Sequence, residues 1–299
     1  MNNFHTSVLL KEVLEFLNPS PDEKFIDATL GGGGHTRELL DKGSMVLGID
    51  QDEDALAFVK EKLKVQSSKF KNLTLAKGNF RDIDKIAHSN GFEKVKGILF
   101  DLGVSSHQID TPERGFSFLK DGPLDMRMDK ESGLTAETLV NLLQKGELND
   151  IFNKFGEEHR AWAISNSIIR ARRVKAIQTT QDLTRVVAEA HGIKGDLSDF
   201  TKNLISKKVF QALRIAVNSE LESISEALPK ALELLEDKGR IAVISFHSLE
   251  DRVVKKTFVD FEKKHMGRII TKKPIEPTEK ENEENPRARS AKLRFFEKK

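Results

Sequence analysis

The stretch FIDATLGGGGHTRELL, residues 25–40, places four consecutive glycines between a short apolar run and an amphipathic segment. Ordering a glycine costs more backbone entropy than ordering any other residue, so four in succession need a physical reason. The pattern predicts a strand, then a glycine-rich turn, then a helix. Such a turn lets the backbone approach a ligand closely, and it is the first candidate binding site.

Strands and helices alternate around this stretch. Short apolar runs recur along the first hundred residues, and an amphipathic helix is predicted between the second and third of them. This alternation is typical of a parallel, doubly wound α/β sheet. The four predicted strands lie in KFIDATL (24–30), SMVLGID (44–50), NLTLAKGNF (72–80) and VKGILFDLGVSS (95–106).

The pattern changes after Ser106, where a turn-rich segment is followed by helical spacings only. A long helix comes next, with apolar residues on one face from Val209 to Ile224, and Pro229 is predicted to punctuate it. Strand patterns then return in RIAVISF (240–246) and AKLRFFEKK (291–299). The sequence therefore predicts one α/β domain, residues 1–106 and 206–299, interrupted by an all-helical insertion, residues 107–205.

Composition narrows the class of protein. The chain has 299 residues, 38% of them hydrophobic, and no cysteine, which excludes disulfides and thiolate zinc sites. No signal-like N-terminus or membrane-length apolar run occurs, so we expect a cytoplasmic location and no membrane partner. The net charge is only +2, but local basic clusters suit a polyanion, or are simply solvated faces. The candidate cations are Arg170, Arg172, Arg173, Arg287, Arg289 and Arg294.

A carboxylate follows the glycine turn at an informative spacing. Asp50 ends the second predicted strand, about 20 residues after Gly31, where parallel-sheet proteins grip a ribose. The dinucleotide fingerprint would need a glycine where the chain has Thr36, and the loop lacks the Lys-Ser/Thr of a P-loop. A sulfonium nucleoside such as S-adenosylmethionine needs no pyrophosphate cradle. The loop therefore favours a methyltransferase over a dehydrogenase.

Two other strand ends carry candidate site residues. Phe80, after the third strand, could stack on adenine or could simply pack in the core. Asp101 ends the fourth strand, facing the expected place of methyl transfer, although it could instead cap a helix.

Seven blocks along the chain resemble one family, the bacterial ribosomal RNA small subunit methyltransferase H family, whose members methylate N4 of a cytosine. The resemblance runs from His5 to Arg294, in the expected order. It implies a class I, Rossmann-like S-adenosylmethionine-dependent methyltransferase fold with an inserted helical domain that recognises RNA. The blocks are HTSVLLKEV, GGGGHT, DLGVSS, RGFSFLKDGPLDMRMD, FQALRIAVNSEL, SFHSLEDR and NPRARSAKLR.

The resemblance also implies roles for individual residues. Asp50 would hold the ribose of S-adenosylmethionine and Phe80 would pack on its adenine. The other cofactor-binding residues would be Gly33, Gly34 and His35 on the methionine part, with Asp101 and Gln108 completing the pocket. The implied substrate is a decoding-centre cytosine in 16S ribosomal RNA of the small subunit. The segment DLGVSS stands where many amine methyltransferases carry an Asp/Asn/Ser-Pro-Pro-aromatic motif, so the amine chemistry comes from the family alone.

Methyl transfer to an aromatic amine needs a group that accepts a hydrogen bond from N4. Asp101 is the first catalytic candidate, and His247, just after a strand, is the second. The scattered histidines predict no metal site. Two alternatives stay open, a non-enzymatic assembly factor that binds ribosomal RNA and, with less support, an NAD-dependent oxidoreductase. The sequence does not decide whether the protein is a homodimer.

Overall fold

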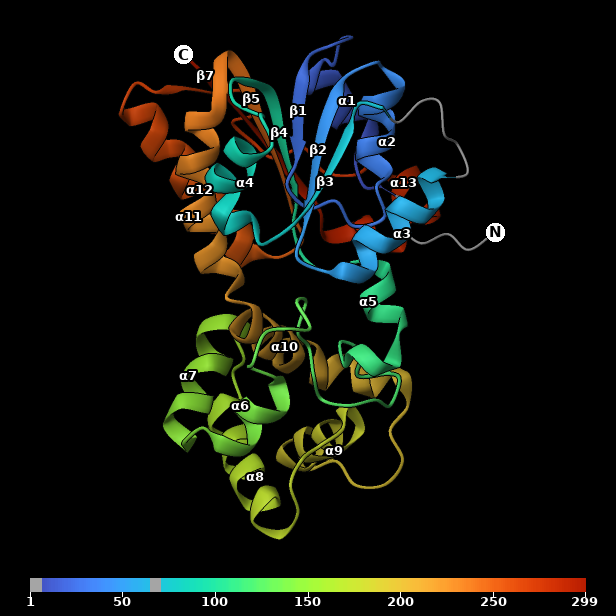
Figure 1. Cartoon of the computed structure of the whole chain (residues 1–299). Coiled ribbons are helices and arrows are strands. Elements are labelled where there is room, and N and C mark those ends of the chain that lie inside the picture. Colours follow the sequence, from blue (N-terminus) through green and yellow to red (C-terminus); the bar gives the residue numbers. More distant parts are fainter. Residues whose placement is uncertain (1–6, 65–70) are drawn as a thin grey trace. The chain divides into compact units, whose positions relative to one another are not determined.

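The computed structural model describes residues 7–64 and 71–299, so His5 and Thr6 of the first family block lie outside it. Contacts divide the chain into two compact units, one of residues 1–105 and 221–299 and one of residues 106–220 (Figure 1). The first boundary of this division lies one residue from the position that the sequence predicts. The second differs from the predicted 205, because helix α10 (Asp199–Asn218) packs against helices of the second unit.

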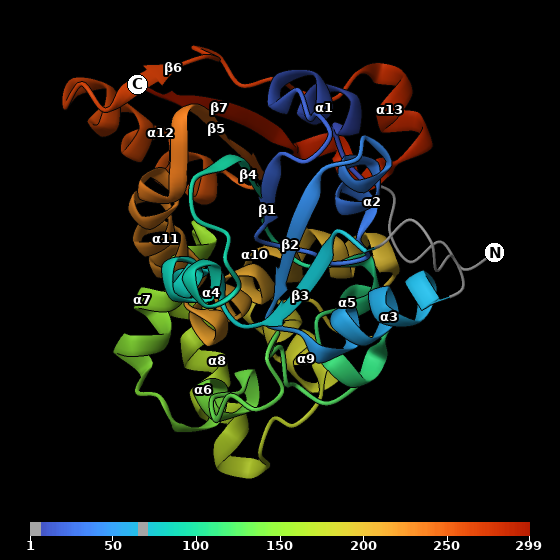
Figure 2. The ribbon, with the colours of Figure 1, turned by 45° about the horizontal axis from the view of Figure 1, so that its top comes forward.

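A single seven-stranded sheet forms the centre of the first unit, in the order β3-β2-β1-β4-β5-β7-β6 (Figure 2). Five strands are parallel, and β7 runs antiparallel to both of its neighbours, β5 and β6. The strands are β1 (Lys24–Asp27), β2 (Met45–Asp50), β3 (Leu73–Lys77), β4 (Val95–Asp101), β5 (Leu235–Ser245), β6 (Gly267–Ile269) and β7 (Lys292–Lys298).

Strand order reverses between β1 and β4, because the chain first adds strands on one side of β1 and then on the other. Loops at the carboxyl ends of these two strands therefore diverge and leave room for a ligand. The glycine loop follows β1, and Asp101 is the last residue of β4. The sheet thus brings the glycine loop, Asp50 and Asp101 to one edge.

Helices cover both faces of the sheet and bury two apolar layers. One layer contains Phe100, Leu228 and Phe258, and the other contains Val13, Phe25 and Phe295, all at most 1% exposed. The helices are α1 (Leu10–Leu17), α2 (Gly34–Asp41), α3 (Glu53–Lys64), α4 (Ile83–Ser89), α11 (Glu220–Leu234), α12 (Ser248–Lys263) and α13 (Glu279–Glu284), with short 3-10 turns at Phe80–Asp82 and Pro286–Ser290.

The second unit is helical, as the sequence predicts. Its helices bury Phe152, Ile164, Leu183 and Leu213 completely, and Thr135, Thr179 and Ser198 cap helix N-termini through their hydroxyl oxygens. The helices are α5 (Ser106–Asp110), α6 (Ala136–Leu142), α7 (Lys145–Gly156), α8 (Ala161–Val174), α9 (Thr180–Ala190) and α10, with a 3-10 turn at Pro112–Arg114.

The predicted long helix over residues 209–224 is two helices. The break falls at Ser219, which has a left-handed φ of 48°, and not at Pro229, which lies inside α11. The paired carboxylate and guanidinium of Glu220 and Arg214 brace this turn at 2.8 Å. Throughout residues 7–64 and 71–299, the helices are too short or too polar to cross a membrane.

Candidate active site

The glycine loop owes its composition to two different requirements. Gly31 and Gly33 have φ values of +50° and +71°, a region that residues with a Cβ rarely adopt. Gly34 has ordinary dihedrals, but a Cβ there would lie 1.9 Å from Ser7 Oγ. Part of the close approach is therefore made by the chain's own N-terminal segment, and the turn at Gly31 and Gly33 remains directed to the sheet edge.

Asp50 ties this loop to the end of β2. Its Oδ2 accepts a hydrogen bond from the Gly31 N–H at 2.8 Å, and its Oδ1 accepts one from the Asp52 N–H at 2.9 Å. Burial raises the pKa of the Asp50 carboxyl to about 6, although both hydrogen bonds act in the opposite direction. A carboxylate oxygen has two lone pairs, so each oxygen keeps acceptor capacity for a ligand hydroxyl.

The end of β3 lies beside this carboxylate. The Asn79 side chain donates to Gln51 Oε1 at 2.9 Å and accepts from the Arg81 N–H, which joins the ends of β2 and β3. Phe80 follows directly and is half-buried, with its ring edge-on to Phe100 at 5.7 Å between centroids. Part of the ring packs in the core, which was one of the two predicted roles of Phe80, and the rest of the ring is exposed.

Asp101 and His35 form a second polar group at the same edge. His35, the second residue of α2, is buried, and its Nδ1 lies 3.7 Å from Asp101 Oδ2. The Asp101 N–H donates to Thr29 Oγ1 at 2.6 Å, which fixes the end of β4 against the loop after β1. Asp27, which the sequence analysis did not single out, lies close to both, and burial raises its pKa.

His247 has a structural task at the end of β5. It is the N-cap of α12, where its Nδ1 accepts from the Glu250 N–H at 3.4 Å. The buried Glu250 carboxylate in turn accepts from the backbone N–H groups of Phe246 and His247. The β4–β5 register, which pairs Asp101 with Ile244, places His247 at the same sheet edge as Asp101. Its catalytic role stays a prediction.

Gln108 lies in the other unit. It is a buried residue of the short helix α5, 5% exposed. Its predicted part in the cofactor pocket stays a prediction.

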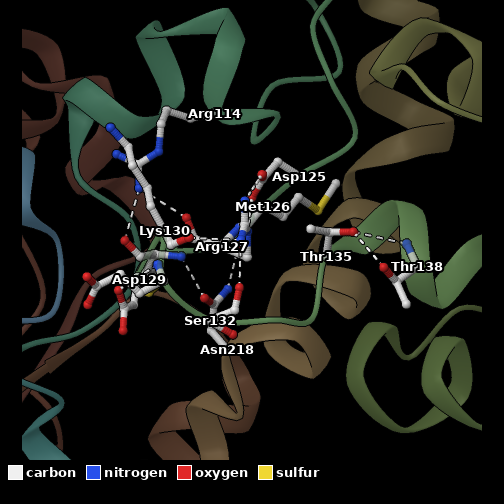
Figure 3. A network of polar contacts seen from close by, with 12 residues as sticks. Arg114, Asp125, Met126, Arg127, Asp129, Lys130, Ser132, Thr135, Thr138 and Asn218 are labelled. Atoms are coloured by element: carbon white, nitrogen blue, oxygen red, sulfur yellow. Dashed lines mark hydrogen bonds and ion pairs between the residues drawn. The ribbon is translucent and has the colours of Figure 1, made fainter.

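The turn-rich segment RGFSFLKDGPLDMRMD is a stapled loop in the second unit (Figure 3). Arg127 forms a two-pronged ion pair with Asp125 and donates to the carbonyls of Lys130 and Ser132. The buried Arg114 donates to the carbonyls of Arg127 and Met128 at 3.0 Å. Arg114 thus holds the backbone of the segment itself, and Arg127 holds the backbone that directly follows it.

Asn218 locks this loop to the end of α10. Its amide donates to the Met126 carbonyl and accepts from the Met128 N–H, both at 2.8 Å, so it bridges Met126 and Met128 (Figure 3). Met126 is buried with a left-handed φ of 64°, a strained conformation for a side chain of its size. Sequence reasoning missed this contact, and its only signal was that both segments belong to family blocks.

The predicted RNA-contacting arginines divide into two groups. Arg172 donates to the carbonyls of Val140 and Leu143, and Arg170 pairs with Glu189 at 2.9 Å. Arg294 is buried and forms an ion pair with Asp251 at 2.6 Å. The exposed residues among the six candidates are Arg170, Arg173, Arg287 and Arg289.

The residues at the sheet edge fit S-adenosylmethionine. The left-handed turn at Gly31 and Gly33 leaves no Cβ at the closest approach, and the Asp50 carboxylate keeps lone pairs for two ribose hydroxyls. Phe80 offers a partly exposed ring beside the end of β3. Asp101 would face the methionine end. Together with the strand order and the reversed β7, these features define a class I S-adenosylmethionine-dependent methyltransferase.

Comparison with known proteins identifies the family. Residues 2–299 match the family model described as the MraW methylase family, and the chain belongs to this family. It is 45% identical to the ribosomal RNA small subunit methyltransferase H of Halothermothrix orenii, over 98% of each chain.

Solved structures resemble the chain less closely. An rRNA methylase from Streptococcus thermophilus has 14% identity and a TM-score of 0.46, covering 96% of this chain and 94% of that one. TrmN from Thermus thermophilus has 12% identity and a TM-score of 0.44, covering 97% of this chain and 48% of that one.

Proposed function

We propose that this protein transfers a methyl group from S-adenosylmethionine to N4 of a decoding-centre cytosine in 16S ribosomal RNA. The observation that carries the proposal is the 45% identity, over 98% of both chains, to a small-subunit ribosomal RNA methyltransferase. The glycine turn, Asp50 and Asp101 at one sheet edge support the cofactor. The choice of cytosine N4 comes from the family resemblance of the sequence blocks.

The chemistry places a specific demand on the site. The cofactor supplies a methyl group activated by a positively charged sulfur, and most of the acceleration comes from holding the nucleophile in line with it. The N4 lone pair of cytosine is delocalised into the ring, so N4 is a weak nucleophile. A carboxylate that accepts a hydrogen bond from N4 localises this lone pair and stabilises the positive charge that develops. Asp101 is the residue proposed for this task.

The helical unit, residues 106–220, is proposed to bind the RNA around the target base, which must leave its stack to be methylated. Its surface offers Trp162, which is 53% exposed and has the Lys145 ammonium 4.0 Å from its ring centroid, and the exposed Arg173. Aromatic rings and cations together suit stacked bases and phosphates. Action on the small ribosomal subunit would place the protein in the cytoplasm.

A labelled methyl-transfer experiment tests the proposal. Small subunits from a strain lacking the gene are incubated with the protein and tritium-labelled S-adenosylmethionine. The RNA is then digested, and the nucleosides are separated and identified by mass spectrometry. We expect the label on N4-methylcytidine from one site. Label on ribose or on another base would contradict the substrate assignment, and free RNA run in parallel shows whether assembly is needed.

Two binding measurements address the alternatives. Calorimetric titration with S-adenosylhomocysteine and with NAD separates a methyltransferase from an oxidoreductase, and only the first should bind. A non-enzymatic assembly factor would bind RNA and leave the label in the cofactor. The Asp101→Ala variant refines this result, since an enzyme should keep RNA binding and lose methylation.

A further inference from the structure

The buried imidazole of His35 has its two nitrogens facing different partners. Nε2 lies 3.1 Å from the carbonyl oxygen of Val8, just before α1. A carbonyl oxygen can only accept a hydrogen bond, so Nε2 must carry the proton. This contact fixes the tautomer, because the second nitrogen, Nδ1, is then the one whose protonation can vary.

Nδ1 points toward the carboxylate that is proposed to act on the substrate. It lies 3.7 Å from Asp101 Oδ2, and the two side chains are only 5% and 11% exposed. With Nδ1 unprotonated and Asp101 ionised, two lone pairs would face each other in a site that little water reaches. One proton between them removes this conflict, either as imidazolium and carboxylate or as imidazole and carboxylic acid.

The surrounding charges favour a proton in this position. Asp27, at the end of β1, is buried and accepts a hydrogen bond from Thr36 Oγ1 at 2.7 Å, and it interacts electrostatically with both His35 and Asp101. Asp50, at the end of β2, interacts in turn with Asp27. The carboxyls of Asp27 and Asp101 therefore face His35 from the neighbouring strands, and Val8 contributes a carbonyl.

We infer that His35 and Asp101 hold one shared proton as an imidazolium–carboxylate ion pair, at 3.7 Å and without a hydrogen bond, and that the Asp101 carboxylate takes up the proton that N4 must lose. This inference rests on the proposed function. As the N4 lone pair bonds to the methyl carbon, the carbon–sulfur bond breaks and its electrons stay on sulfur. N4 then carries two protons and a positive charge. One proton passes to the Asp101 carboxylate, and the pair, holding two protons, returns one to water.

Asp101 is the catalytic residue in this scheme and His35 is a positioning residue that acts through it. The imidazolium keeps Asp101 ionised and directed until the proton arrives. This differs from the role that the family resemblance implies for His35, contact with the methionine part of the cofactor. A cofactor contact would make the His35 side chain matter for binding, and a shared proton makes it matter for proton transfer.

Nitrogen-15 NMR of histidine-labelled protein without ligand or RNA tests the shared proton directly. We expect His35 to show protons at both ring nitrogens near neutral pH, and to revert to the neutral Nε2–H form in Asp101→Asn. The His35→Gln variant assigns the signal. The matched control is His88→Gln, because the His88 side chain is 57% exposed. An unprotonated Nδ1 that does not respond to Asp101→Asn would overturn the inference.

The kinetic test uses His35→Gln, whose amide can still donate to the Val8 carbonyl. We expect the affinity for S-adenosylhomocysteine to stay within about threefold, the methyl-transfer rate to fall roughly 100-fold, and the acid limb of the pH–rate profile to move to higher pH. An unchanged rate and profile would refute the inference while leaving the proposed function intact. If the wild-type protein methylates no cytosine, the proposed function fails, and the NMR result still decides the shared proton.

Discussion

Asp50 at the sheet edge and Asp125 in the stapled loop are both aspartates in polar regions, but their surroundings shift the pKa in opposite directions. At the sheet edge, burial raises the pKa of Asp50 to about 6, and its hydrogen-bond partners are backbone N–H groups. In the stapled loop, burial also acts to raise the pKa of Asp125, but the hydrogen bonds and charge of Arg127 outweigh it and lower the pKa. In the loop, Arg127 therefore neutralises the Asp125 carboxylate. At the sheet edge, the Asp50 carboxylate keeps capacity to accept hydrogen bonds from a ligand.

The difference between Asp50 and Asp125 helps to distinguish a functional carboxylate from a structural one. Each region contains a charged residue of a family block, Asp101 at the sheet edge and Asp125 in the loop, and composition alone would treat the two regions alike. A buried carboxylate such as Asp50, whose pKa is raised and which accepts hydrogen bonds from backbone N–H groups, marks a candidate site, whereas a carboxylate matched by a guanidinium, such as Asp125, marks a structural contact. We therefore expect substitutions at the edge to affect chemistry and binding, and substitutions in the loop to affect stability.

The largest effect is expected at Asp101. Asp101→Asn keeps the shape of the side chain and removes its capacity to take a proton, so the methyl-transfer rate should fall by about 10²–10⁴-fold. The thermal midpoint should change little, because the Asp101 backbone N–H keeps its bond to Thr29. Single-turnover assays with saturating cofactor measure the rate. Asp110→Asn, whose side chain is 56% exposed, is the control, and a rate within threefold of wild type in Asp101→Asn would reject the assignment.

The stapled loop should respond in stability. Asn218→Ala removes two hydrogen bonds that hold Met126 in its left-handed conformation, and it leaves a buried carbonyl and N–H to find new partners. We expect a loss of about 2–3 kcal/mol in the free energy of unfolding, measured by urea denaturation. Asn153→Ala, an exposed asparagine on α7, should cost less than about 0.5 kcal/mol.

Equal losses in the two asparagine variants would mean that the network in Figure 3 contributes nothing specific. If Asn218→Ala lost affinity for S-adenosylhomocysteine while its stability stayed unchanged, the distinction between a functional sheet edge and a structural loop would be wrong. The loop would then belong to the binding chemistry.

Cofactor binding should depend on pH through Asp50. Ribose hydroxyls donate to the ionised carboxylate, and the pKa of Asp50 in the free protein is raised to about 6. Affinity for S-adenosylhomocysteine should therefore be full above pH 6 and fall as the pH drops through 6, by about tenfold at pH 5. Calorimetry at several pH values measures this. Asp50→Asn should bind more weakly with a flat profile, and Asp41→Asn, on the outer face of α2, should keep the wild-type profile.

The same group predicts the sign of a stability change. A raised pKa in the folded state means that ionising Asp50 disfavours the fold, so its contribution is most favourable below the ordinary value of 3.8 and declines through pH 6. Ligand binding should reverse this decline. An affinity that increases toward pH 5 would show that Asp50 does not bind the ribose as an anion.

The sequence predicted the parts of the molecule that local patterns determine. The alternating strands, the strand-end positions of Asp50 and Asp101 and the helical insertion follow from periodicity and from parallel-sheet geometry. The family blocks pointed to the cofactor. What local patterns could not supply were contacts between distant segments, such as Ser7 with Gly34, or Asn218 with Met126, which are 92 residues apart.

The helix break at Ser219 shows the same limit. Pro229 was the stronger local signal, because proline lacks an N–H and disfavours helix interiors. The chain nevertheless turns at Ser219, where the Arg214–Glu220 ion pair and the Asn218 contacts to the loop stabilise a left-handed residue. Tertiary contacts outweighed propensity there, and only the folded chain reveals them.

His247 gives the smallest expected effect and the sharpest comparison within the sheet edge. Its Nδ1 caps α12 and its Nε2 faces the Glu250 carboxylate at 3.2 Å, so its ring resembles the matched groups of the stapled loop more than Asp101. Asparagine is also a good N-cap, and His247→Asn should keep both stability and the methyl-transfer rate within about threefold. His247→Ala should cost about 1 kcal/mol in stability. A rate about 100-fold slower in His247→Asn, with an unchanged thermal midpoint, would instead make His247 the proton acceptor. His247 would then be a functional residue, like Asp101, and not only a helix cap.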